Sequence, residues 1–279
     1  MPIKRGFVDI PDGQIHYREL RDQPGRVVVM LHSNPGSSAM LLPMIERFGV
    51  FRPVIAPDTL GFGDSSRARQ EWPQIADYAA ATLAALDALG IERFDLYGNH
   101  TGANIAVEIA LAQPERVGCV ILDGIAFYSP EMKRDLLANY APPVLPDHEG
   151  RHLLWTWHFV RDQWLFWPWF RRDREHRRDL SLPDPAYLNA VVLDVLKSLG
   201  TFQAGYRASF EYRKEERLPL LRVPTMVASS RTDIFFPELD QVAALVPNVT
   251  KAIVGGESSE ELDEAVALFR EFLGRPNSV

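Results

Sequence analysis

The chain has 279 residues, 46% of them hydrophobic, a formal net charge of −7 and a pI near 5.5. This size and composition predict a globular protein with a full hydrophobic core, built as one domain or as one domain with a large insertion. The acidic balance excludes nucleic acid and anionic lipid as expected partners, and no run of about 18 apolar residues indicates a membrane span.

The N-terminal residues 1–13 carry Lys4 and Arg5 but lack the apolar stretch of a secretory signal. The single cysteine, Cys119, lies in an apolar run and has no second cysteine with which to form an internal disulfide. Both features fit a reducing compartment, and we expect a cytoplasmic protein.

Short apolar runs predict four strands in the first half of the chain, at 26–32, 52–57, 94–97 and 117–122. Between the second and third strands, hydrophobic side chains recur at helical spacing before Gly90, where a helix would stop; they are Ile75, Tyr78, Ala79, Thr82, Leu86 and Leu89. Alternating strands and helices predict a mostly parallel, doubly wound sheet of about eight strands with helices on both faces.

This alternation stops after Asp123 and resumes with a strand at 224–230, a helix at 237–245, a strand at 249–254 and a helix at 260–273. We therefore assign residues 1–124 and 222–279 to the α/β core and residues 125–221 to an inserted helical cap. The mixed charges of 171–179 predict a solvated helix face with ion pairs, with a docking patch for an anionic ligand as the alternative.

The cap contains five of the six tryptophans: Trp155, Trp157, Trp164, Trp167 and Trp169. Most of these rings are expected to pack the cap against the core. One or two of them would line an apolar pocket, and Trp155 and Trp164 are the candidates for contact with a substrate.

Three loops follow predicted strands, at the edge where open α/β sheets bind ligands. The first is His-Ser-Asn-Pro-Gly at 32–36, and the second is Asp-Thr-Leu-Gly-Phe-Gly-Asp-Ser at 58–65. The third is Gly-Asn-His-Thr-Gly at 98–102, in which glycines flank His100 between a strand and a helix.

In their order and spacing, these loops resemble those of the α/β-hydrolase superfamily along essentially the whole chain. The cap position and Asn34 are most similar to the haloalkane dehalogenase and epoxide hydrolase branch. The resemblance implies an oxyanion hole formed by the backbone N–H groups of Ser33 and Thr101, and a nucleophile elbow at His100. The 58–65 loop is structural more often than catalytic in this family.

The resemblance also implies a nucleophile, an acid and a histidine in that chain order. Asp233 occupies the acid position, and Asp123 is a substitute for it. The histidine position reads Gly-Gly-Glu-Ser-Ser at 255–259, which places Glu257 there, and no histidine follows His176. Two of the three family residues are therefore replaced.

We expect His100 to act as a general base oriented by Glu257 or Asp233, in place of a Ser-His-Asp triad. The helix that follows His100 favours the neutral imidazole, whereas a carboxylate partner favours the cation, and the sequence leaves this balance open. In an alternative, covalent mechanism, Ser33 is the nucleophile and His100 is its base. Asn34 is either a donor to the substrate or a cap for its loop.

The expected activity is hydrolysis of a small hydrophobic or aromatic ester, lactone or ketone without a cofactor. The alternatives are a lyase or cyclase that abstracts a proton, and a pseudo-hydrolase that only binds a small ligand. A laboratory-made substitution at His100 would not explain the missing late histidine. No metal is expected, because the other histidines show no ligand spacing; they are His16, His32, His148, His152, His158 and His176. The oligomeric state is not predictable from these residues.

Overall fold

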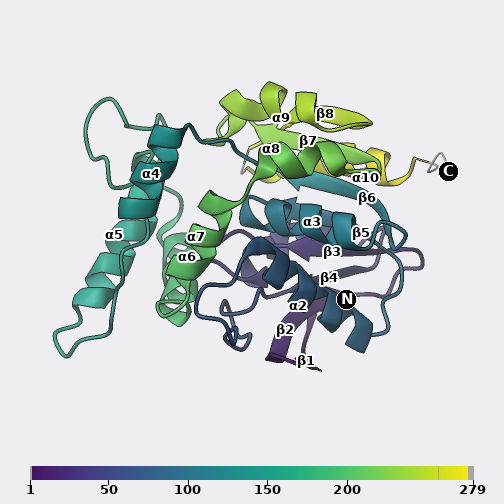
Figure 1. The fold of residues 1–279 in the computed structure, drawn as a ribbon, viewed down its shortest axis with the longest axis horizontal. Helices are drawn as coiled ribbons and strands as arrows, with labels where there is room; N and C mark the ends of the chain where they lie inside the picture. Colours follow the sequence, from purple (N-terminus) through teal and green to yellow (C-terminus); the bar gives the residue numbers. More distant parts are fainter. Residues whose placement is uncertain (1, 257, 276–279) are drawn as a thin grey trace.

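A computed structural model describes residues 2–256 and 258–275 of the chain. Its centre is an eight-stranded sheet in the order β1-β2-β4-β3-β5-β6-β7-β8 (Figure 1). The strands are β1 (Lys4–Ile10), β2 (Gly13–Leu20), β3 (Val27–Leu31), β4 (Val54–Pro57), β5 (Phe94–Asn99), β6 (Val117–Asp123), β7 (Thr225–Ser230) and β8 (Val249–Val254). Only the pairs β1–β2 and β2–β4 are antiparallel in the described sheet, which confirms the predicted fold class.

Helices cover both faces of this sheet. They are α1 (Leu42–Phe48), α2 (Ile75–Ala88), α3 (Thr101–Ala112), α9 (Leu239–Leu245) and α10 (Ser259–Leu273). The sheet has a hydrophobic core on each face, and successive residues of β3 point alternately into one or the other. Val29 and Leu31 pack with α2 and α3, whereas Val28 and Met30 pack with α1 and α10. This is the period of two that a strand buried on both sides requires.

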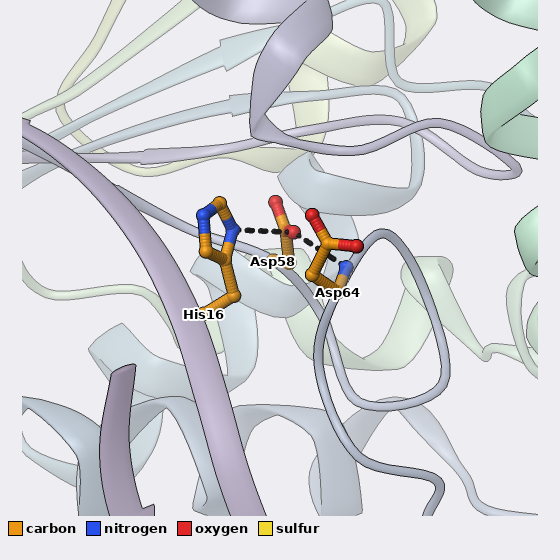
Figure 2. A group of neighbouring side chains, drawn as sticks. All are labelled: His16, Asp58 and Asp64. Atoms are coloured by element: carbon orange, nitrogen blue, oxygen red, sulfur yellow. Dashed lines mark hydrogen bonds and ion pairs between the residues drawn. The ribbon is translucent and has the colours of Figure 1, made fainter. Parts of the chain in front are cut away.

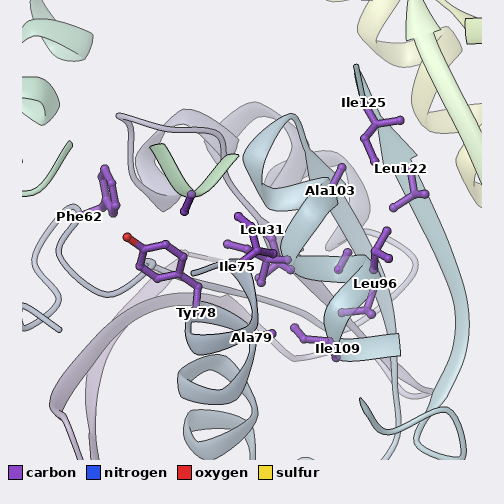
Figure 3. Packing of buried hydrophobic residues seen from close by; sticks show 14 of the residues in the cluster. Leu31, Phe62, Ile75, Tyr78, Ala79, Leu96, Ala103, Ile109, Leu122 and Ile125 are labelled. Atoms are coloured by element: carbon purple, nitrogen blue, oxygen red, sulfur yellow. The ribbon is translucent and has the colours of Figure 1, made fainter. Parts of the chain in front are cut away.

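The helical spacing read before Gly90 corresponds to α2, whose buried face meets the sheet. Figure 3 shows Ile75 of this helix beside Leu31 of β3, while the Tyr78 ring lies toward Phe62. Both helix residues are at most 2% exposed. Gly90 has a positive φ of +67°, as the stop signal predicted.

Between β6 and β7 the chain forms α4 (Pro130–Asn139), α5 (Arg151–Leu165), α6 (Pro185–Lys197), α7 (Phe202–Glu211) and the short α8 (Lys214–Arg217). Figure 1 shows α4 to α7 gathered beyond one end of the sheet, while α8 lies near α3. A helical insertion is therefore present at the predicted place. Its division from the core at residues 125 and 221 stays a prediction.

The predicted helix face over 171–179 is wrong, because this segment has an irregular backbone with an isolated bridge between Phe166 and Arg177. Pro168 and Pro183 flank the segment and lack the N–H that a continuing helix needs. Arg171 pairs with Asp135 of α4 and Arg172 with Asp162 of α5, so these two arginines contact acids outside their own segment. Among the described helices, none is long and apolar enough to cross a bilayer.

Candidate active site

The turn between β5 and α3 presents His100 in a strained conformation. Its φ of 49° and ψ of −107° lie outside the regions that residues with a side chain prefer, at a cost of about 1 to 3 kcal/mol. The flanking glycines make this turn sterically possible. A Cβ on Gly98 would lie 2.4 Å from the carbonyl oxygen of Gly102, and one on Gly102 would lie 2.1 Å from that of Leu31.

The imidazole of His100 forms a hydrogen bond with Asp233, which follows the end of β7. Nε2 lies 2.7 Å from Oδ2 of Asp233, while Oδ1 of the same carboxylate accepts a 2.7 Å bond from the backbone N–H of Phe235. The Phe235 ring lies 4.8 Å from the imidazole, centroid to centroid. For Nδ1 of His100, the described part of the chain supplies no hydrogen-bond partner.

Burial and the nearby carboxylates act in opposite directions on the pKa of His100. Burial lowers the pKa of His100, but the charge and hydrogen bond of Asp233 and the charge of Asp123 raise it, and the net direction is upward. Burial likewise raises the pKa of Asp233, and the nearby His100 outweighs this and lowers it. The two carboxylates therefore outweigh the burial of the His100 ring. The His100 side chain keeps 30% of its surface exposed, because it borders a cavity.

Asp123, the substitute acid at the end of β6, has a different partner. Its Oδ2 accepts a 2.7 Å hydrogen bond from the hydroxyl of Tyr97. Burial raises the pKa of Asp123 to about 6, opposed by the Tyr97 bond and supported by the charge of Asp233. Asp233 is thus the hydrogen-bond partner of His100, and Asp123 is a second nearby carboxyl group. Glu257, the other predicted partner, lies outside the described residues.

The loop after β3 is held by His32. Its Nε2 accepts a 2.9 Å bond from the backbone N–H of Thr59, so Nδ1 carries the proton and donates to the carbonyl of Ser33 at 2.9 Å. Ser33 and Thr101 both line the cavity beside His100. Thr101 is the first residue of α3, where a backbone N–H has no partner within the helix. An oxyanion hole formed by these two residues stays a prediction.

The cavity has a volume of about 510 Å³ and lies between the carboxyl ends of the strands and the helical insertion. Asn34 lines it with an amide that is buried and has no hydrogen-bond partner among the described residues. Trp164 also lines it. Trp155 is not among its lining residues and instead stacks on Phe159, with ring centroids 5.0 Å apart.

Some cavity residues were missed in the sequence. Trp167 was counted only as a packing ring, yet it borders the cavity and lies 5.7 Å from the Phe235 ring. Arg178 lay in the segment assigned to a solvated helix. It donates to the carbonyl oxygens of Gln163 at 2.8 Å and Thr232 at 2.9 Å, and so joins the insertion to the loop that carries Asp233. The sequence did not indicate this contact, because the charged residues around Arg178 favoured the interpretation as a solvated helix face.

A second cluster of titratable groups lies away from His100. His16, Asp58 and Asp64 bring ligand-type atoms within 4.8 Å of one another, which their spacing in the sequence did not suggest (Figure 2). The Asp58 carboxylate is already saturated. It accepts bonds from His16 Nδ1 at 2.8 Å, from the Asp64 backbone N–H at 3.0 Å, and from the Ser38 N–H and hydroxyl at 2.7 and 2.5 Å. This arrangement fits a clamp between loops better than a metal site.

The mostly parallel sheet, the helices on both of its faces and the helical insertion after β6 together define an α/β-hydrolase fold. The profile of the family described as "alpha/beta hydrolase fold" matches residues 26–257. The chain belongs to this family.

Curated relatives match parts of the chain. A 2-hydroxymuconate semialdehyde hydrolase from a Pseudomonas species is 38% identical over 37% of this chain and 37% of its own length. Haloalkane dehalogenase 2 of Mycobacterium tuberculosis is 29% identical over 51% of this chain and 50% of its own length. A proline iminopeptidase of Heyndrickxia coagulans is 29% identical over 48% and 47%. The chain thus spans about half or less of the length of these relatives.

Solved structures show the same fold over nearly the whole chain. Epoxide hydrolase A of Mycobacterium thermoresistibile superposes with a TM-score of 0.75 at 16% identity, covering 99% of this chain and 100% of its own. The enol-lactonase of Burkholderia xenovorans superposes with a TM-score of 0.73 at 17% identity, covering 97% and 100%. At these identities the likeness concerns the fold alone.

Proposed function

We propose that the protein is a hydrolase of small hydrophobic or aromatic esters, lactones or ketones, in which His100 is the general base and Asp233 orients it. The observation that carries this proposal is the 2.7 Å contact between His100 Nε2 and Asp233 Oδ2. In the neutral ring, Nε2–H donates to the carboxylate and Nδ1 keeps its lone pair. The aspartate fixes this tautomer, as the acid does in a Ser-His-Asp site.

In the proposed reaction, Nδ1 of His100 removes a proton from water as the water oxygen attacks the substrate carbonyl. The backbone N–H groups of Ser33 and Thr101 stabilise the resulting oxyanion. The imidazolium then returns the proton to the leaving alkoxide, or to the leaving carbon when a carbon–carbon bond of a ketone breaks. A positioned base contributes about 10²- to 10⁴-fold, which suits activated substrates.

The names of the relatives support this substrate class. The relatives include a 2-hydroxymuconate semialdehyde hydrolase and a haloalkane dehalogenase, and the structural neighbours include an enol-lactonase and an epoxide hydrolase. Their shared feature is a small organic substrate. The Asn34 amide and the Trp164 ring would contact such a substrate in the cavity.

A ligand-binding protein without turnover is the second candidate function. The observation that favours it is the ion pair itself, because two carboxylates raise the pKa of His100 and reduce the fraction of neutral base. Proton abstraction of the lyase or cyclase type needs the same base and would appear as turnover of an enolisable ketone without addition of water.

Turnover of a panel of nitrophenyl esters, aromatic lactones and aromatic ketones by the protein and by His100→Ala tests the proposal. The matched control is His148→Ala, since His148 is exposed in the helical insertion. We expect His100→Ala to lose about 10²-fold or more in kcat/KM while His148→Ala keeps it. Equal rates for all three proteins would end the base assignment, and tight ligand binding without turnover would establish the second candidate.

A further inference from the structure

A buried lysine borders the same cavity as His100. Lys214 begins α8, is 3% exposed, and lines the cavity with its side chain. Its Nζ donates to the carbonyl oxygen of Ser209 at 3.3 Å and lies 4.6 Å from the centroid of the Tyr128 ring. No carboxylate of the described residues lies within ion-pair distance of it. A lysine is almost never buried this deeply without a charged partner.

Beside Lys214, an amide is also incompletely bonded. Asn104 of α3 is 2% exposed and lines the cavity, where its Nδ2 donates to the Ser209 hydroxyl at 3.0 Å and its Oδ1 has no partner among the described residues. A serine hydroxyl both donates and accepts, so this contact permits either orientation of the amide. If the amide is rotated by a half-turn, its Oδ1 accepts from the Ser209 hydroxyl and its Nδ2 becomes the atom without a partner, which is a hydrogen-bond donor. Two side chains on different helices thus contact the same residue, Ser209, and both border the cavity with hydrogen-bonding capacity to spare.

We propose that Lys214 and Asn104 bind the carboxylate of a small organic acid within the cavity. One ammonium group and one amide N–H match the single charge and two oxygens of a carboxylate. Burial lowers the pKa of Lys214 to about 7, and an anion beside it would restore the charged form. This proposal depends on the proposed function in one respect only, namely that the bound acid is a substrate of the protein.

The aromatic side chains between the two sites define the shape of the ligand. The Tyr128 ring, which contacts Lys214, lies 6.1 Å from the Phe235 ring, and Phe235 lies 4.8 Å from His100. Two rings therefore separate the ammonium group from the imidazole. A matching ligand is elongated and apolar in its middle, with its acid at Lys214 and its reactive carbonyl at His100.

Calorimetric binding of phenylbutanoate and phenylbutanol tests this site without any turnover. At about pH 6, where Lys214 is charged, we expect the carboxylate to bind about tenfold tighter than the alcohol. Lys214→Met keeps the apolar stem and should reduce this preference to about twofold or less, with the affinity for phenylbutanol unchanged. Lys251→Met, at an exposed lysine of β8, is the control and should behave like the unmodified protein.

Asn104→Leu is a second variant and should lower phenylbutanoate affinity about fivefold. Equal binding of acid and alcohol by the unmodified protein, or binding of neither, overturns the proposal even if the variants do not fold. A full preference retained by Lys214→Met, or tighter binding of phenylbutyl phosphate than of phenylbutanoate, also overturns it. Because neither probe is turned over, loss of this site and loss of the His100 chemistry are separate results.

Discussion

The imidazole of His100 lies directly against the backbone of Gly124, the first residue after β6. A Cβ atom on Gly124 would lie 2.4 Å from Cδ2 and 2.6 Å from Nε2 of the ring, and 3.0 Å from Oδ2 of Asp233. The first two separations are shorter than nonbonded atoms tolerate, and the third is tight. The contact between His100 and Asp233 therefore depends on a glycine that directly follows the neighbouring strand β6.

Gly124→Ala should separate the imidazole from Asp233, because the new methyl group occupies the position of the ring. We expect at least about a tenfold loss of kcat/KM on whichever ester of the panel is turned over best. Gly90→Ala is a matched control, since Gly90 has a φ of +67° close to the +70° of Gly124 but no atom within 4 Å of the added Cβ. Both substitutions carry the backbone penalty of about 1 kcal/mol, so equal losses of activity would refute the steric argument.

The pH dependence of activity should report the ion pair. Because Asp233 and Asp123 raise the pKa of His100, kcat/KM of the unmodified protein is expected to increase with pH through a midpoint above the usual imidazole value of 6.5. In Asp233→Asn, only Asp123 still opposes the burial that lowers this pKa, so the midpoint should move to lower pH. The maximal rate should also fall about tenfold or more, because the ring loses its orienting acceptor.

Titration of the ring by NMR measures the same pKa without turnover. Asp240→Asn is the control, since Asp240 is an exposed acid paired with Lys251. A midpoint that Asp233→Asn leaves unmoved, while the protein stays folded, contradicts the assigned ion pair.

Stability should depend on pH through Asp123. Its folded pKa of about 6 exceeds its usual value of 3.8, so the folded protein holds this proton more tightly than the unfolded chain does. The free energy of unfolding therefore decreases as pH rises between these two values, and the loss is complete above the folded pKa. Asp123→Asn should increase the free energy of unfolding at about pH 7 by on the order of 1 kcal/mol and change it little at about pH 4.

Urea denaturation at several pH values measures this effect. Asp22→Asn is the control, since Asp22 is an exposed acid far from the cavity residues in sequence. Its free energy of unfolding should follow that of the unmodified protein at every pH. If Asp123→Asn is less stable than the unmodified protein at neutral pH, the Tyr97 bond to a charged carboxylate outweighs the cost of burial and the prediction is wrong.

The strands β3 to β8 were the most predictable part of this protein. The run at 249–254 corresponds to β8 residue for residue, and the run at 26–32 brackets β3. Of these two strands, β3 is buried along almost its whole length and reads as an unbroken apolar run, as buried parallel strands do. The antiparallel β1 and β2 escaped notice, because β1 alternates exposed and half-buried residues and has no apolar run.

The site was predictable where one loop follows one strand. His100 and Asp233 each come just after a strand, and the parallel order of β5, β6 and β7 brings them to the same edge of the sheet. Other contacts between segments that lie far apart in the sequence were not predictable. Lys214 and Arg178 reach the cavity from irregular or short segments of the insertion, whose path leaves no periodic signal in the sequence.

The last prediction concerns Asp58, whose carboxylate joins β2, the loop after β3 and the loop after β4 (Figure 2). Burial raises the pKa of Asp58, but the hydrogen bonds from His16, Ser38 and Asp64 outweigh burial and hold this pKa far below its usual range. Asp58→Asn puts an N–H group where two donors now converge. Removing one member of such a buried network costs about 3 kcal/mol, which lowers Tm by roughly 6 to 12 °C for a chain of this size.

Asp64→Asn is the matched control for this clamp, because Asp64 gives Asp58 only its backbone N–H and pairs its side chain with the exposed Lys197. This change should cost less than about 1 kcal/mol. Thermal melts with added Zn²⁺, Mn²⁺ or EDTA distinguish a clamp from a metal site, since a saturated carboxylate has no free lone pair for a cation. A rise in Tm with Zn²⁺ that Asp58→Asn and Asp64→Asn both abolish would instead make the cluster a metal site, because only bound metal would need both carboxylates.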